Sequence, residues 1–260
     1  MTKKISILIL LVSISLQTFA WGTTGHRVVG EIADSYLSRK AKRSIREILG
    51  NESVAMSSNW ADFAKSDSTL KYLDPWHYIN VKAGMNATEF ANYLKNDTGI
   101  DAYTKLNFLI TELKNKQISL EQKRFYLRLL IHIAGDIHQP MHVSRAEDLG
   151  GNRIRLSWFN EPTNLHALWD DKLITFQNLS YTEYAASINH TEKQQRREWQ
   201  QQPMSEWFFE SYQLADKVYA SVKPEQKLSY RYNFDNVEMM NQQLLKGGVR
   251  LAGLLNEIFG

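Results

Sequence analysis

Histidine and aspartate residues stand one helical turn apart at two places in this sequence, a spacing that suits metal binding. His132 and Asp136 are four residues apart in an apolar stretch, and His166 and Asp170 repeat that spacing further along the chain. Side chains at positions i and i+4 of a helix lie on one face, so the members of each pair can address the same ion. The two pairs therefore predict metal coordination by imidazole and carboxylate groups.

Other candidate ligands accompany these pairs. His142 follows Pro140, which ends the first predicted helix, and Asp62 and His77 each stand beside a tryptophan that could shield a metal pocket. A single histidine on an apolar face is more often structural than a ligand, and a single aspartate near a helix start is usually a cap. The combination is different, because five of the seven histidines join three aspartates and no cysteine competes as a ligand.

Two histidines fall outside this pattern. His138 is predicted to be a structural partner of the ligands rather than a ligand itself. His190 is predicted to be a surface residue.

The first twenty residues have the three parts of a secretory signal peptide. Lys3 and Lys4 come first, an apolar run covers Ile5 to Leu16, and the small-residue ending is Thr18-Phe19-Ala20. The apolar run is too short to span a bilayer, which takes about 20 apolar residues, although a retained membrane anchor is the alternative. We therefore expect a signal peptide over residues 1–20 and a secreted or periplasmic product without a membrane segment.

Cleavage after Ala20 would also create a ligand. Trp21 would become the N-terminus, five residues before His26. The free α-amine and the carbonyl oxygen of Trp21 can chelate an ion in a five-membered ring, and His26 can bind the same ion from the first helical turn. Processing is thus predicted to complete a metal site.

The remaining length, residues 21–260, suits one domain, and 43% hydrophobic residues is enough to fill a sizeable core. Without cysteine, an exported chain must be held by packing and metal rather than by disulfides. Removing Lys3 and Lys4 from the 31 basic residues leaves 29 against 28 acidic ones, a net charge of +1. This charge excludes a polybasic grip on duplex DNA, so an anionic substrate must be held locally. We expect a monomer.

Hydrophobic periodicity predicts helix almost throughout the chain. The segment from His26 to Leu49 has apolar residues at helical spacing, with Thr24 as its cap and Gly50 as its stop. The same pattern predicts helices over Ser58–Lys65, Ala87–Lys95, Ala102–Lys114, Leu120–Ile137, Asn164–Phe176, Ser205–Ser221 and Asn236–Phe259. The fold class expected is all-α, a single mainly helical domain.

Strand signals are scarce. Tyr78–Val81 and Ile154–Trp158 could be short extended pieces, the second preceded by a Gly150-Gly151-Asn152 turn. They allow at most one short β-hairpin. The polar stretch Gln194–Gln202 is predicted to be a solvated helix face or a loop.

Six stretches of the sequence carry a specific resemblance. They are Trp21-Gly22-Thr23-Thr24-Gly25-His26, Trp60-Ala61-Asp62, His77-Tyr78-Ile79-Asn80, His132 to His142, Gly150-Gly151-Asn152 and His166 to Asp170. They resemble the zinc-dependent single-strand-specific nucleases and 3′-nucleotidases of the S1/P1 type, within the phospholipase C/nuclease superfamily. The absence of cysteine fits a bacterial-type member, because the eukaryotic members carry disulfides that this chain lacks.

The resemblance implies three Zn²⁺ ions and nine ligand residues. For the first ion they are Asp62, His77 and His132, for the second Trp21 and His26, with Asp136 bridging these two, and for the third His142, His166 and Asp170. It also implies hydrolysis of single-stranded DNA and RNA to 5′-phosphorylated products, and removal of 3′-phosphates from nucleotides, by zinc-activated hydroxide.

Four further residues have predicted roles beside the metals, and Asp62 and Asp136 are counted as catalytic through the ions they hold. Lys65, one turn after Asp62, could neutralise charge on the reacting phosphate, or be simply a solvated lysine. Tyr78 could stack on a base and Asn80 hydrogen-bond to its edge, or both could be structural. Asn152 is placed with these substrate-binding residues. Stacking in such a pocket requires an unpaired base, which predicts faster cleavage of single strands.

Two other functions compete with this interpretation. A zinc-dependent phospholipase C shares the N-terminal tryptophan, but that family has a longer gap from Trp to His and Glu as the last ligand. Here the gap from Trp21 to His26 is five residues and the last ligand is Asp170. The second alternative, a secreted zinc-binding module without turnover, is disfavoured by Lys65 and Tyr78 beside the ligands.

Overall fold

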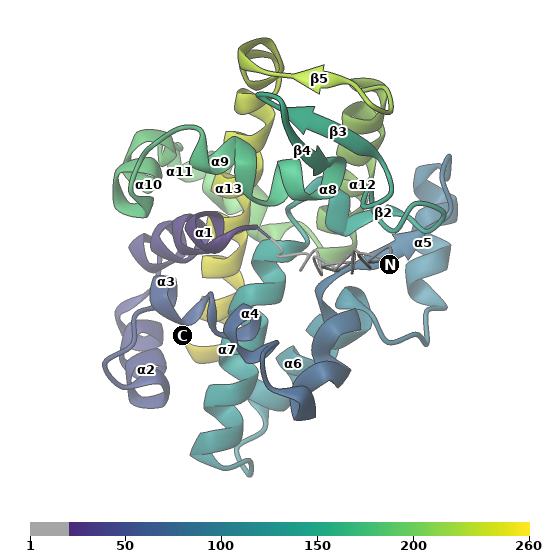
Figure 1. Cartoon of the computed structure of the whole chain (residues 1–260). Coiled ribbons are helices and arrows are strands. Elements are labelled where there is room, and N and C mark those ends of the chain that lie inside the picture. Colours follow the sequence, from purple (N-terminus) through teal and green to yellow (C-terminus); the bar gives the residue numbers. More distant parts are fainter. Residues whose placement is uncertain (1–20) are drawn as a thin grey trace, which may run out of the picture.

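Two long helices run through the centre of the molecule (Figure 1). The computed structural model describes residues 21–260, so the predicted signal peptide lies outside the described residues. Helix α7 covers Leu120–Asp136, and helix α13 covers Tyr230–Phe259 and packs against it. From Leu127 to its end, α7 is buried at every residue except Arg128. A helix enclosed on all sides belongs to the core, and the polar ligands on α7 are enclosed with it.

Other helices surround this central pair (Figure 1). The α-helices are α1 (Thr23–Ser35), α2 (Arg39–Leu49), α3 (Val54–Ser57), α4 (Trp60–Ala64), α5 (Ala87–Lys95), α6 (Ala102–Lys114), α8 (Leu165–Ala167), α9 (Leu173–Thr175), α10 (Tyr181–Ile188), α11 (Lys193–Gln201) and α12 (Met204–Ala220). Helices of other pitch are the 3₁₀ helices η1 (Ser68–His77) and η2 (Pro140–His142) and the π-helix η3 (Leu168–Lys172). The mainly helical fold class predicted from the sequence is confirmed.

The strands form two small sheets. In the first, β1 (Ile79–Val81) and β2 (Val143–Arg145) pair in parallel. In the second, β3 (Arg155–Trp158) is antiparallel to β4 (Glu161–Asn164) and parallel to β5 (Lys227–Leu228). Only β3 and β4 form the hairpin that the sequence allowed. The additional strands have two to four residues, too few for an alternating pattern to be detected.

The predicted helix from His26 to Leu49 is two helices. Helix α1 ends at Ser35 and α2 begins at Arg39, after a turn in which the Ser38 side chain accepts from the Ala41 N–H. Serine at this position caps a new helix, and this signal inside an unbroken apolar pattern was missed.

Some of the other helices have the bounds that the sequence predicts, and others do not. Helices α5 and α6 have the predicted bounds, because each begins at a polar residue whose side chain caps it. The predicted helix Asn164–Phe176 instead begins as strand and is interrupted by the π-helix η3. Within residues 21–260, no helix combines the length and apolarity needed to cross a bilayer.

Candidate metal centre and catalytic cleft

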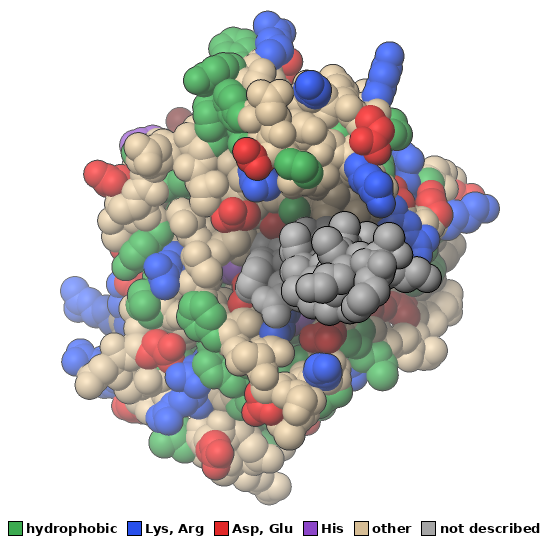
Figure 2. Space-filling model, viewed as in Figure 1, with side chains coloured by type: hydrophobic (Ala, Val, Ile, Leu, Met, Phe, Trp, Pro, Cys, Tyr) green, Lys and Arg blue, Asp and Glu red, His purple; other side chains and the backbone are tan. Residues whose placement is uncertain are grey.

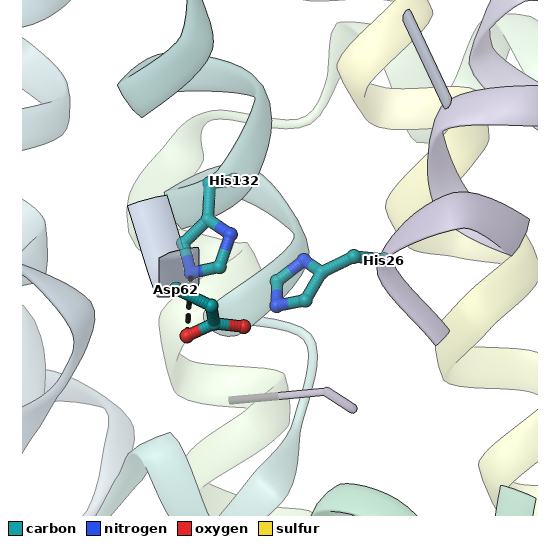
Figure 3. A group of neighbouring side chains, drawn as sticks. All are labelled: His26, Asp62 and His132. Carbon is teal, nitrogen blue, oxygen red and sulfur yellow. Dashed lines mark ion pairs between the residues drawn. The ribbon is translucent and has the colours of Figure 1, made fainter. Parts of the chain in front are cut away.

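Three helices bring one imidazole or carboxylate each to a single point. His26 comes from α1, Asp62 from α4 and His132 from α7, and their side chains converge in Figure 3. The two imidazole rings stack with 3.9 Å between centroids, and His132 Nε2 lies 3.8 Å from the Asp62 carboxylate. All three residues are buried. Together with Asp136, we call these residues the helical group.

Asp136 offers its two oxygens in different directions. Oδ1 lies 3.2 Å from His26 Nε2, whereas Oδ2 lies 2.9 Å from His77 Nδ1 and 3.4 Å from His132 Nε2. A carboxylate with histidines on both sides is suited to bridge two ions.

A second set of ligands stands on turns rather than on long helices. His142 ends η2, His166 lies in the single turn α8, and Asp170 lies in η3. The Asp170 oxygens are 3.4 Å from His142 Nε2 and 3.2 Å from His166 Nε2. We call these three residues the turn group. Nearby, the Gln139 side-chain amide donates to Asp170 Oδ1 at 2.5 Å.

Backbone carbonyls orient three of the histidine rings. His132 Nδ1 donates to Ser58 O at 2.6 Å, His142 Nδ1 to His77 O at 2.8 Å, and His166 Nδ1 to Gly150 O at 2.7 Å. Because each Nδ1 carries the proton, each Nε2 keeps its lone pair for an ion. Such outer hydrogen bonds fix the tautomer and the ring orientation of metal-binding histidines.

Several buried ligand atoms lack a hydrogen bond in the described part of the chain. They are His26 Nε2, Asp62 Oδ2, Asp136 Oδ1, His142 Nε2 and Asp170 Oδ2. Buried polar atoms are normally satisfied, so this concentration at one place indicates a missing partner. Imidazole nitrogens and carboxylate oxygens are ligands that zinc accepts. The residues therefore fit bound metal ions, and three sets have the spacing to hold one, two of them sharing His132 and the third being the turn group.

The electrostatics of the ligands also suit metal binding. Burial lowers the pKa of His132 to about 3, which keeps its ring neutral. Burial works against ionisation of Asp170, yet the neighbouring His166 and His142 lower the pKa of its carboxyl to about 2. Burial is likewise outweighed at Asp136, where His132 and His26 hold the pKa well below its usual value. Neutral imidazoles and ionised carboxylates are the states that bind metal.

The N-terminal residues of the described chain lie against the ligand residues. Trp21 is fully buried, and the Gly22 N–H donates to Asp170 O at 2.5 Å. Gly135 leaves the room that His26 occupies, because a Cβ there would lie 3.0 Å from His26 Nδ1. The cleavage predicted before Trp21 involves residues outside the described range, so the role of its amine stays a prediction.

A cavity of about 620 Å³ opens beside His77 and the turn group. It is lined by Lys65, Lys71, Asp74, His77, Tyr78, Asn80, Met141, His142, Leu149, Asn152, Arg153, Asn164 and His166. The structure thus brings all four predicted phosphate- and base-binding residues to one cavity. Lys65 Nζ lies 2.7 Å from Asp62 Oδ1, and the Tyr78 side chain is 37% exposed.

Sequence reasoning missed three charged residues of this lining, namely Lys71, Asp74 and Arg153. Lys71 and Asp74 lie six and three residues before His77 in η1. Residues three apart in a 3₁₀ helix share a face, so these two follow the ligand into the cavity. Recognising η1 as a 3₁₀ helix would have found them.

The two histidines excluded as ligands lie apart from these groups. His138 is fully buried, donates from Nδ1 to Ala134 O at 2.7 Å, and accepts from Arg250 at Nε2 at 3.1 Å. Both ring nitrogens are therefore used within the fold. His190 is exposed.

Comparison with known proteins agrees with this centre. The family described as S1/P1 Nuclease matches residues 21–260. The chain is 29% identical to Endonuclease 2 of Arabidopsis thaliana over 267 residues, which cover 92% of this chain and 91% of that protein. It is 26% identical to Nuclease P1 of Penicillium citrinum over 267 residues, or 92% and 98% of the two chains. Nuclease S1 of Aspergillus oryzae is 31% identical over 164 residues, 60% of this chain and 55% of that one.

The chain belongs to the S1/P1 nuclease family, and the resemblance predicted from its motifs is confirmed. It is an enzyme of the class that hydrolyses phosphate esters in nucleic acids.

Proposed function

We propose that the protein is a secreted or periplasmic zinc-dependent nuclease and 3′-nucleotidase. It cuts single-stranded DNA and RNA to 5′-phosphorylated products and removes 3′-phosphates from nucleotides. The observation that carries the proposal is a cavity lined by His77, by two histidines of the turn group, by a lysine and by an exposed tyrosine. The buried helical group lies behind this wall, in contact with it through His77 and Lys65.

Three zinc ions would be held by the nine residues named from the sequence. These are Asp62, His77 and His132 for the first ion, Trp21 and His26 for the second, Asp136 for both, and His142, His166 and Asp170 for the third. Bound zinc supplies Lewis-acid stabilisation of phosphoryl oxygens and water of lowered pKa. The domain spanning residues 21–260 would then be a trinuclear zinc nuclease.

Lys65 places a positive charge where the reacting phosphate enters. Its residue lines the cavity, and its ammonium group lies 2.7 Å from Asp62 Oδ1. This contact holds the ammonium group in position before a phosphate binds. Burial of Asp62 opposes ionisation, but His132 and Lys65 lower the pKa of its carboxyl, so the carboxylate stays ionised. A fixed cation of this kind stabilises negative charge that grows on phosphate oxygens in the transition state.

Tyr78 and two amides supply the surface for a base. Tyr78 directly follows the ligand His77, and Asn80 and Asn152 line the same cavity. A base stacked on Tyr78 would have amide donors and acceptors at its edge, and every base has a face that can stack. Because a paired base must first leave its duplex at a cost of a few kcal/mol, single strands are the preferred substrates.

The outer surface offers little general attraction for nucleic acid. Basic and acidic side chains are mixed over the face shown in Figure 2. With a net charge of +3 for the whole chain, binding depends on contacts inside the cavity rather than on a broad basic surface. We propose that the enzyme acts as a monomer.

The test uses purified protein that begins at Trp21. Single-stranded DNA, RNA and 3′-AMP are each incubated with and without a chelator, and zinc is measured on the same preparation. We expect about three zinc ions per chain and hydrolysis of all three substrates that the chelator abolishes. Phosphatidylcholine serves as the control substrate. Zinc binding without hydrolysis, or faster turnover of phosphatidylcholine, would contradict the proposal.

A further inference from the structure

The loop between β2 and β3 serves the turn group and the cavity at once. Its Gly150 carbonyl accepts from His166 Nδ1 at 2.7 Å, and Asn152 and Arg153 line the cavity. The backbone in between is unusual, because Leu149, Gly150 and Gly151 have φ of +56°, +64° and +82°. A left-handed conformation is unfavourable for a residue such as leucine, so contacts elsewhere must hold this loop.

The loop also lies directly on the chain that leads to His142. A Cβ on Gly150 would lie 2.5 Å from Met141 O, and one on Gly151 would lie 3.1 Å from Met141 Sδ. Only glycine therefore fits at positions 150 and 151, where the loop packs against Met141.

Asp148 holds this loop to helix α12. Its Oδ1 accepts from the Gly151 N–H at 2.8 Å and from the Tyr219 hydroxyl at 2.7 Å. The Tyr219 hydroxyl is also 3.0 Å from Ser144 Oγ in β2. One carboxylate oxygen thus joins the left-handed turn to a helix that carries no metal ligand.

Tyr219 is itself held in place. The Arg145 guanidinium lies 4.0 Å from the centre of the tyrosine ring and donates to Asp216 Oδ1 at 2.9 Å, one turn earlier on α12. Tyr219 is buried, and burial raises the pKa of its hydroxyl, which keeps the proton that it donates.

We propose that Tyr219 and Asp148 are positioning residues of the metal centre, which fix the Gly150 carbonyl against His166 and hold the loop that brings Asn152 to the cavity. This inference rests on the proposed function, because it assigns a role toward the third zinc ion. Partners that orient a metal-binding histidine typically change metal affinity by 10- to 100-fold when they are lost. A residue one step further out should have an effect near the lower end of that range.

The chain offers matched variants for the test. Tyr219→Phe removes only the hydroxyl, and Asp148→Ala removes the acceptor. Asp148→Asn keeps an oxygen that can accept from both donors and should restore the loop. Tyr212→Phe is the control, because Tyr212 stands on the same helix, is buried, and donates its hydroxyl to Lys82 O at 2.8 Å, away from the ligands.

Zinc affinity is measured by competition with a chelator, and hydrogen exchange of the Gly151 amide is measured in the metal-free proteins. In Tyr219→Phe and Asp148→Ala we expect one of the zinc ions to bind about tenfold more weakly, the others unchanged, and the Gly151 amide to exchange faster. KM for a single-stranded substrate should rise in the same two variants. Asp148→Asn and Tyr212→Phe should resemble the unchanged protein.

Two results would overturn the inference. One is an unchanged affinity for every zinc ion in Tyr219→Phe, and the other is an equal loss in Tyr212→Phe, which would mean that any lost hydroxyl on α12 has this effect. Amide exchange at Gly151 requires neither zinc nor turnover. A failure of the proposed function in the unchanged protein would therefore be recognised separately from a failure of this positioning role.

Discussion

The helical group and the turn group hold similar ligands on different supports. Three of the four residues of the helical group stand on α1 and α7, helices of 13 and 17 residues, and Asp62 stands on the five-residue α4. The turn group stands entirely on η2, α8 and η3, none longer than five residues, and depends on acceptors and donors from other segments. Gly150 O, His77 O and the Gln139 amide supply these contacts.

His77 connects the two groups. Its ring lies against Asp136, while its backbone carbonyl accepts from His142. His77, on the cavity wall, thus joins the helical group, which we expect to be rigid, to the turn group, which we expect to be adjustable. The comparison teaches that the helical group should resist distant changes, whereas the turn group should respond to residues that touch no ligand.

The largest effect is expected at Asp136, the residue of the helical group that has histidines on both sides. Asp136→Ala removes the carboxylate that lies between His26 and His77, so the two ions proposed for this group would each lose a ligand. We expect hydrolysis of single-stranded DNA to fall by more than about 10³-fold and the melting temperature of the zinc-loaded protein to fall, because metal binding is coupled to folding. Asp34→Ala is the control, since Asp34 pairs with Lys42 at the surface. Near-normal zinc content in Asp136→Ala would contradict the bridging role.

The next effect tests the N-terminal side of the helical group. If the Trp21 amine is a ligand, a residue left ahead of it turns the amine into a planar amide without a lone pair to donate. A verified N-terminally extended protein should carry one zinc ion fewer and lose roughly 100-fold in rate, while the turn group keeps its ion. Mass spectrometry of the N-terminus, zinc analysis and a nuclease assay make the measurement on both forms. Equal zinc and equal rates would exclude the amine as a ligand.

The same contrast explains what the sequence could reveal. His132 and Asp136 were found together because i, i+4 spacing on a long helix is a local property. His166 and Asp170 have that spacing too, but they are carried by one α-turn and a π-helix, so their pattern indicated a helix that the structure interrupts. Family resemblance, rather than periodicity, grouped them with His142.

Residues that act through long-range contacts were not predictable. Lys71 is placed at the cavity by a 3₁₀ helix, which helix propensity does not indicate. Arg153 is placed there by the left-handed turn that precedes it. Tyr219 lies 71 positions from Asp148, and nothing local in α12 distinguishes it from other buried tyrosines. Such contacts form when whole helices and loops pack together. They have no fixed spacing in the sequence by which they could be recognised.

A smaller effect is expected at the cavity edge of the helical group. Lys65→Ala should lower kcat by about 10- to 100-fold and leave KM nearly unchanged, because a cation that answers to growing charge acts on the transition state. Lys65 also contacts Asp62, so zinc content is measured to separate catalysis from metal binding. Lys65→Arg, which keeps the charge, is the companion variant. A rise in KM alone would make Lys65 an anchor for the bound substrate.

The smallest effect is a difference in the pH at which the two groups lose zinc. It can be measured without a substitution. Burial lowers the pKa of His132 to about 3, so this ring stays neutral through mild acid. Burial acts in the same direction on His142, but the Asp170 carboxylate, 3.4 Å from His142 Nε2, outweighs it and raises the pKa of His142 above its usual value. A protonated imidazole cannot bind zinc.

As the pH falls, His142 therefore takes up a proton well before His132 does, and the turn group should lose its ion at a higher pH than the helical group. In the metal-free protein, by contrast, protonation of His142 favours the folded state. The raised pKa of His142 contributes stability that is present below the unfolded pKa of about 6.5 and is lost at higher pH, whereas the lowered pKa of His132 reduces stability from about pH 6.5 down to about 3. Zinc content is measured after dialysis at steps from about pH 7 to about pH 4. His166→Ala, with the turn group already impaired, should lack the first step of zinc loss, and simultaneous release of all ions from the unchanged protein would show that the two groups are not independent.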